Sequence, residues 1–165
     1  IMKALLQRVK NASVSVEGKK ISEIGPGLLV FLGVMKEDTQ SVSDLLAEKI
    51  CQLRIFQYTD PETKKEKHFE KSLLEAGKEL LVVSQFTLCG SCTNGRRPSF
   101  DDAMPPSAAL SLYEYFVSAL RKKMTVSGQP LRVAEGQFQA YMDVELVNDG
   151  PVTFLIDTAL VSIGL

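Results

Sequence analysis

The chain has 165 residues, of which 45% are hydrophobic and 24% charged, and its formal net charge is −1. These proportions are those of a soluble globular protein long enough for one sizeable core. No apolar run approaches the ~20 residues of a membrane-spanning helix, and the N-terminus has no signal-peptide pattern, so we expect no membrane contact and a cytoplasmic location. The near-zero charge excludes an overall basic surface for nucleic acid and leaves only local basic patches.

Four strands are predicted near the N-terminus. Apolar residues predict strands over residues 2–9 and 28–34, and the nearly continuous apolar run of the second is typical of a strand buried on both faces. Strict alternation predicts a half-buried strand over residues 12–17. A glycine turn then lets residues 21–24 pair back, so these strands follow one another with short turns.

The middle of the chain changes to a helical period. A stripe of apolar residues predicts a helix over residues 39–53, with Asp38 or Thr39 as its N-cap. Residues 54–58 are predicted to form a short strand. The charged, proline-containing residues 59–67 are predicted to form a loop.

The second half repeats the order of strand, helix and strands. A buried strand is predicted over residues 79–88, followed by a long loop to about residue 105. Pro106 suits the first turn of a helix that extends to about residue 124. Strict alternation predicts a strand over residues 137–146, and a last strand is predicted over residues 152–160.

Strands therefore occur in adjacent runs instead of alternating with helices. This order indicates an α+β fold with a mostly antiparallel, barrel-like sheet of about seven to eight strands and two main helices. Because the chain has no repeat or long linker, residues 1–165 are predicted to form a single domain.

Side chains for the common catalytic devices are scarce. His68 is the single histidine and lies in a charged stretch, which favours a solvated loop residue over a catalytic base. Cys89 and Cys92 form a lone CxxC without the further ligands of a zinc site, so two incidental loop thiols are the simpler interpretation and a redox or metal role is the alternative. Neither phosphate-binding glycine motifs nor carboxylates at metal-ligand spacing are present, and no metal or cofactor is expected.

Two polar stretches interrupt apolar surroundings. Ser84, Gln85 and Thr87 lie at the end of a predicted buried strand, where their polar groups need partners if they are buried. They mark either the point where the strand emerges into the loop or the wall of a pocket. The second stretch is NDGPVT, residues 148–153, between two predicted strands. By its residues alone it is most simply a hairpin tip, and the alternative is a backbone placed close to a ligand.

Taken together, SQFTL (residues 84–88) and NDGPVT resemble the two signature motifs of the D-aminoacyl-tRNA deacylases, formerly called D-tyrosyl-tRNA deacylases. Further segments resemble the same family in the same order: residues 6–9, 12–14, 27–33, 54–56, 95–100 and 113–116. The resemblance covers residues 2–157, and the tail from residue 158 to 165 is assigned no role.

The resemblance implies hydrolysis of the ester between a D-amino acid and the 3′ end of tRNA by a homodimer with sites at the subunit interface. The SQFTL-like segment would line the pocket, which makes catalytic candidates of four residues: Ser84, Gln85, Phe86 and Thr87. The Gly150–Pro151 unit would be cis and reach in from the other subunit, with Arg8 holding its loop. Cys89 and Cys92 depart from the family pattern, which argues against a catalytic thiol.

The chemistry of this reaction fits the residues that are present. An aminoacyl ester is labile, so backbone N–H groups of Phe86 and Thr87 facing the oxyanion, with water activated by the ribose hydroxyl of the substrate, can replace a histidine. Carbonyls of Gly150 and Pro151 facing the substrate Cα would exclude L side chains but not glycine.

Arg96 and Arg97 form a local basic patch for tRNA, although solvated surface charge is the simpler interpretation. The alternative function is a nucleic-acid-binding module without catalysis.

Overall fold

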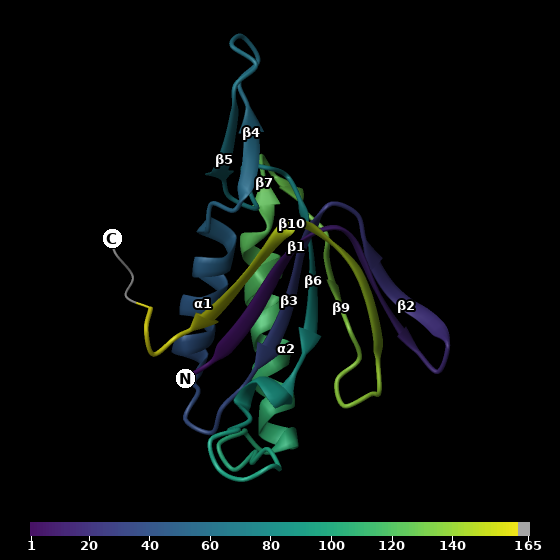
Figure 1. Cartoon of the computed structure of the whole chain (residues 1–165), viewed down its shortest axis with the longest axis vertical. Coiled ribbons are helices and arrows are strands. Elements are labelled where there is room, and N and C mark those ends of the chain that lie inside the picture. Colours follow the sequence, from purple (N-terminus) through teal and green to yellow (C-terminus); the bar gives the residue numbers. More distant parts are fainter. Residues whose placement is uncertain (162–165) are drawn as a thin grey trace.

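The computed structural model describes residues 1–161 of the chain, and its elements are labelled in Figure 1. In chain order the described residues form β1 (Lys3–Val16), β2 (Lys19–Ile24), β3 (Gly27–Gly33), α1 (Gln40–Gln52), β4 (Phe56–Thr59), β5 (Glu66–Lys71), β6 (Glu79–Ser84), the 3-10 helix η1 (Phe86–Cys89), α2 (Pro106–Lys123), β7 (Thr125–Val126), β8 (Gln129–Pro130), β9 (Val133–Glu135) and β10 (Asp143–Asp157). The last four residues, which belong to the unassigned tail, lie outside this description.

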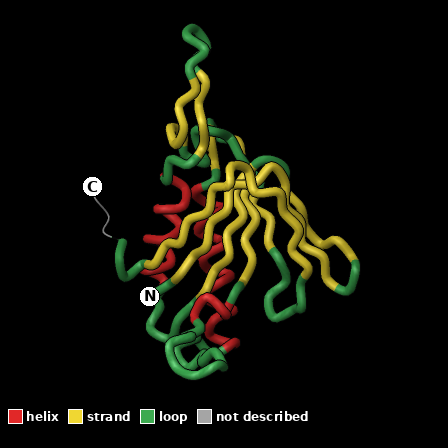
Figure 2. Tube along the Cα trace, in the orientation of Figure 1, coloured by secondary structure: helices red, strands yellow, loops and turns green. Residues whose placement is uncertain are grey.

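The main sheet has the strand order β10-β1-β3-β6-β9, with β2 paired to β1. β1 pairs antiparallel with β10, β2 and β3, whereas β3–β6 and β6–β9 are parallel. The parallel pairs follow from the crossovers through α1 and α2, since a parallel neighbour cannot be reached by a tight turn. Figure 2 shows the strands bending over an apex, with both helices on one side. The predicted α+β class with a barrel-like sheet and two main helices is confirmed, but the sheet is mixed instead of mostly antiparallel, because β3–β6 and β6–β9 are parallel.

Two apolar clusters lie on opposite faces of the sheet. Leu28, Val30 and Leu32 of β3 face α1 and α2 in the larger cluster, whereas Leu29 joins the smaller cluster beneath the bent part of β1 and β10. The same alternation holds in β6, because Leu81 belongs to the smaller cluster while its neighbours belong to the larger one. β3 and β6 are thus buried on both faces, as their continuous apolar runs predict.

Both helices lie where the sequence predicts them. Thr39 caps α1, because its hydroxyl accepts a hydrogen bond from the backbone N–H of Val42 at 3.4 Å. α2 begins at Pro106, whose missing N–H costs nothing in a first turn. Its apolar stripe is buried: Ala109, Leu112, Tyr113, Phe116 and Leu120.

The predicted strand over residues 79–88 is too long. β6 ends at Ser84, and its last link to β3 is the hydrogen bond from the Gln85 N–H to the Leu32 carbonyl at 2.8 Å. β3 itself stops at Gly33, so the next residues have no partner strand and coil into η1. Gly33 permits this turn to sit close, because a Cβ there would lie 2.9 Å from the Cβ of Leu88.

The predicted hairpin at NDGPVT is wrong. β10 runs unbroken through it from Asp143 to Asp157, although residues 137–142 before it form a turn where strand was predicted. Its partner β1 is likewise one strand where two were predicted. Asn148 pairs with Val9 and Thr153 with Gln7, so residues 149–152 bulge opposite Arg8. Bulges use the same residue types as turns, and proline is tolerated in them, which explains the misinterpretation.

The prediction of a loop over residues 59–67 is also wrong at both ends, because Thr59 belongs to β4 and β5 begins at Glu66. Strands β4 and β5 pair as a separate hairpin, and its tip alone is irregular. His68 lies on β5 and not in a loop, and it is exposed. The short strands β7, β8 and β9 were not predicted, because two or three residues are too few to show a period.

Candidate functional site

A cavity of about 730 Å³ opens where β6 gives way to η1. Ser84, Gln85 and Phe86 line it, as the pocket interpretation of this stretch predicts. Thr87 is not among the lining residues. Its hydroxyl accepts a hydrogen bond from Nε2 of Gln85 at 2.5 Å, which joins the two side chains into one polar unit.

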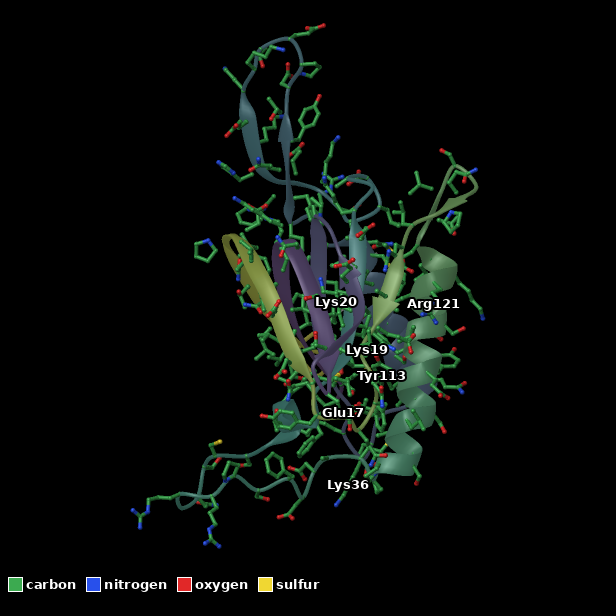
Figure 3. All side chains as sticks on the ribbon, turned by 90° about the vertical axis from the view of Figure 1, so that its right-hand side faces the viewer. Glu17, Lys19, Lys20, Lys36, Tyr113 and Arg121 are labelled. Carbon is green, nitrogen blue, oxygen red and sulfur yellow. The ribbon has the colours of Figure 1, made fainter. Side chains whose placement is uncertain are left out.

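The other wall of this cavity comes from α2 and the turn before β10, including Tyr113, Phe138 and Tyr141. The Tyr113 hydroxyl donates to the Val82 carbonyl at 3.1 Å, and its ring tilts against Phe138 with centroids 5.7 Å apart. Figure 3 shows Tyr113 between α2 and the sheet. Burial raises the pKa of Tyr113 far above its ordinary value, so the residue is a neutral, fixed donor.

Exposed aromatic side chains mark the mouth of the cavity. Phe86, the first residue of η1, is 62% exposed, and the centroid of its ring lies 5.0 Å from that of Phe100. Tyr141 is 91% exposed. Tyr113, Phe138 and Tyr141 were not predicted as site residues, because their helical and alternating positions are equally typical of core and surface residues.

The first backbone N–H groups of η1 lack partners within the turn. Within η1 the N–H of Leu88 bonds to the Gln85 carbonyl at 3.2 Å, and that of Gly90 bonds to the Thr87 carbonyl at 3.0 Å. The first N–H groups of a helical turn have no carbonyl partner inside it. The N–H groups of Phe86 and Thr87 occupy these first positions, so they are available to an acceptor outside the turn.

The second motif lines a different cavity of about 530 Å³, formed by the bulge and by the β4–β5 hairpin. The Gly150–Pro151 peptide bond is cis. Gly150 has φ +154°, and a Cβ there would lie 2.6 Å from the backbone nitrogen of Val152. This position therefore requires glycine. Arg8, Lys10, Gln57, His68 and Phe69 complete the lining.

Arg8 is the main brace of the bulge and is 7% exposed. Its Nε donates to the Asp149 carbonyl at 3.0 Å, and one terminal nitrogen donates to the Ile55 carbonyl at 2.7 Å. The Asp149 carboxylate lies 3.4 Å from Nε. Asn148, which was not predicted as a site residue, adds a second brace, because its side-chain oxygen accepts a hydrogen bond from the Val152 N–H at 2.8 Å.

Within this chain the two predicted halves of the site do not meet. Among the described residues, none lines both cavities, so Ser84, Gln85 and Phe86 are separated from Gly150 and Pro151. Arg8 is close to the second pair only. The fold therefore places the two motifs at separate cavities of the chain.

The remaining candidates lie outside both cavities. Arg96 and Arg97 are exposed in a loop closed by paired backbone hydrogen bonds between Ser91 and Ser99. Cys89 is buried with its thiol directed to the Val34 carbonyl, and burial raises the pKa of this thiol. Cys92 is exposed. In residues 1–161 no group of three or more metal-binding side chains gathers, and none of the helices there is long and apolar enough to cross a membrane.

Comparisons with known proteins cover nearly the whole chain. The D-aminoacyl-tRNA deacylase of Thermodesulfovibrio yellowstonii is 48% identical over 157 residues, spanning 95% of this chain and 99% of that protein. The protein of the same name from Thermosipho africanus is 51% identical over 157 residues, spanning 95% and 97%. The solved structure of the c-Myc DNA Unwinding Element Binding Protein matches with TM-score 0.83 and 42% identity over 94% of this chain and 97% of that one. A model of the D-Tyr-tRNA(Tyr) deacylase family matches residues 5–157, and the chain belongs to that family.

Proposed function

We propose that this protein hydrolyses the ester bond of D-aminoacyl-tRNA and releases free D-amino acid and tRNA. The observation that carries the proposal is the identity of about half of all positions, over 95% of the chain, with proteins named for that activity. The two motifs also occupy places in the fold where the backbone departs from regular pairing. In this proposal residues 1–165 are one deacylase domain that acts in the cytoplasm without a cofactor.

The proposed reaction uses the 730 Å³ cavity for the ester. The N–H groups of Phe86 and Thr87 bind the oxyanion that forms when water adds to the ester carbonyl. The adjacent ribose hydroxyl of the substrate accepts a proton from that water and passes its own proton to the departing ribose oxygen. The ester C–O bond breaks in this step, which leaves the free carboxyl group of the amino acid and the two ribose hydroxyls of the tRNA. Gln85 holds the Thr87 hydroxyl, so Thr87 positions the turn or the substrate instead of forming a covalent intermediate.

A second copy of the chain completes the proposed site. Because the two motifs line separate cavities in one subunit, a single chain cannot present both to one substrate. A homodimer places Gly150 and Pro151 of one subunit against the partner's cavity. The exposed apolar side chains Phe86 and Leu155, each 62% exposed, are surface that such an interface would cover.

Substrate selection in this proposal depends on backbone atoms. A side-chain pocket would discriminate by size, whereas the enzyme must accept many D side chains and reject L ones. Carbonyls of Gly150 and Pro151 next to the substrate Cα would collide with an L side chain and leave a D side chain free. The braces from Arg8 and Asn148 support a rigid wall. Glycyl-tRNA is accepted, because glycine has no side chain to collide with these carbonyls.

The contact with tRNA phosphates in this proposal is made by Arg96 and Arg97, which are exposed on the loop that follows η1.

The test is hydrolysis of matched D- and L-tyrosyl-tRNA by the purified protein, followed by glycyl-tRNA. We expect rapid hydrolysis of the D ester, negligible hydrolysis of the L ester and measurable hydrolysis of the glycyl ester. Equal rates for the D and L esters would reject stereoselective deacylation. Complete refusal of glycyl-tRNA would reject the steric filter while leaving the deacylase activity in place.

The second candidate is a nucleic-acid-binding module without catalysis. It is favoured by the structural relative at 42% identity, whose name refers to binding of a DNA element. The same assay separates the two candidates, because a binding module would retain D-aminoacyl-tRNA without releasing the amino acid.

A further inference from the structure

The β4–β5 hairpin stands apart from the main sheet and has no strand partner in it among the described residues. Figure 1 shows it projecting beyond the end of the sheet, away from the loop that follows η1. One side of its base nevertheless faces the Gly150–Pro151 bulge, because His68 and Phe69 of β5 line the same cavity as these two residues. A protruding hairpin thus forms one wall around the segment proposed to select the substrate.

Phe69 has an unusual backbone at this place. Its φ is +56°, the left-handed region that bulky L-residues rarely adopt. The pairing of β4 with β5 is irregular here, with a register shift between Phe56 and Tyr58. Such a conformation persists only where surrounding contacts hold it, and it often occurs at functional sites. Its effect is to set the direction of the Phe69 side chain.

The contact that Phe69 makes is with the strand that carries the bulge. Its ring meets the ring of Phe154 edge-on, with centroids 6.2 Å apart and planes at 77°. Phe154 lies on β10 just beyond the bulge and pairs with Leu6 of β1. On the other side of the bulge, Arg8 joins the Asp149 carbonyl to the Ile55 carbonyl at the base of the hairpin. The hairpin is therefore fastened to β10 both before and after Gly150–Pro151.

From these two attachments we infer that the β4–β5 hairpin is the support of the Gly150–Pro151 segment and that Phe69 is a positioning residue for stereoselection. This inference rests on the proposed function. Phe69 acts through Phe154 and does not touch the reacting atoms. A wall that rejects L side chains by collision works only if it does not yield, so loss of the support is expected to admit L substrates more than it slows D substrates.

The test compares Phe69→Ala with Phe69→Leu and with Tyr58→Ala. Tyr58 is the matched control, because it is an aromatic residue on the same hairpin that does not line the cavity. The Nζ atom of Lys71 lies 4.7 Å from the centroid of its ring. For Phe69→Ala we expect the ratio of L to D hydrolysis to rise roughly three- to tenfold, the factor that one aromatic pair accounts for. Phe69→Leu restores most of the selectivity, and Tyr58→Ala keeps the wild-type ratio.

Hydrogen–deuterium exchange gives a readout that does not depend on activity. Peptides covering residues 147–155 should exchange faster in Phe69→Ala than in the wild type or Tyr58→Ala. An unchanged L-to-D ratio in folded Phe69→Ala, or equal losses on both substrates, overturns the inference and leaves the deacylase proposal intact. Unchanged exchange at the bulge overturns it as well. If the wild-type protein hydrolyses no D ester, the proposed function fails, and exchange alone decides whether Phe69 supports the bulge.

Discussion

The end of β6 and the bulge of β10 expose backbone groups for opposite reasons. At Ser84 the partner strand β3 ends, so the next residues coil into η1 and their first N–H groups lose strand partners. At Gly150 the partner strand β1 continues, and residues 149–152 form a bulge before the pairing with β1 resumes at Thr153. The hydrogen bonds that close η1 join backbone groups, whereas the second site is braced by the side chains of Arg8 and Asn148. Variants should therefore damage the second site through the backbone conformation of Gly150 and through its side-chain braces.

The largest effect is expected for Gly150→Ala. The added Cβ would lie 2.6 Å from the Val152 nitrogen at φ +154°, so the bulge must change shape. We expect D-aminoacyl-tRNA hydrolysis to fall about a hundredfold, which corresponds to the upper range of the cost of a forbidden backbone conformation. Single-turnover kinetics measure this. The control is Gly18→Ala, which has φ +74° with open space around it and should lose stability but not activity. Full activity of Gly150→Ala would contradict a role for this backbone.

Arg8→Ala should produce the next largest effect, on stability. The carbonyls of Asp149 and Ile55 would lose a buried charged donor, with an expected loss of about 2 kcal/mol in the free energy of unfolding. Urea denaturation measures this loss. Arg54→Ala is the control, since Arg54 is exposed and pairs with Glu75 only at 3.8 Å. Equal unfolding free energies for the two variants would show that Arg8 is not the brace.

A smaller effect is expected for Thr87→Ala at the first site. Removing the hydroxyl that accepts from Gln85 should lower turnover roughly tenfold, the upper range for one hydrogen bond, because the backbone donors remain. Thr93→Ala, on the exposed loop, should have no effect. Near-total loss of turnover, together with an ester trapped on the wild-type protein in mass spectrometry, would instead make Thr87 a nucleophile.

The smallest effects are expected at the cysteines. Cys92→Ser and Cys89→Ser should retain activity, and a thiol reagent at pH 8 should modify exposed Cys92 but neither buried thiol.

Burial raises the pKa of Cys51 from 9.0 to about 11, so the folded state retains a proton that the unfolded state releases. Its contribution to stability is complete below pH 9 and is lost as the pH rises towards 11. Thermal unfolding between pH 8 and 11, compared with Cys51→Ala, measures this loss.

Residues with a clear period or cap were predictable from the sequence. Thr39 and Pro106 locate the starts of both helices, and the apolar runs of β3 and β6 indicate burial on both faces. Errors occurred where the outcome depended on a partner strand. Leu88 continues an apolar run yet lies in η1 because β3 has already ended, and NDGPVT has turn residues yet lies within a continuous strand.

The sequence by itself determined the helices, the two-sided burial of the central strands, the α+β class and the two motifs, because local periods and residue types specify these features. Only the tertiary structure decided that one motif begins a 3-10 turn, that the other is a bulge braced by Arg8, and that the two line separate cavities. The physical reason is that each outcome depends on where a distant strand ends or continues. Such pairings depend on contacts between residues far apart in sequence, such as Arg8 with Asp149 and Phe69 with Phe154, and local sequence patterns do not specify these contacts.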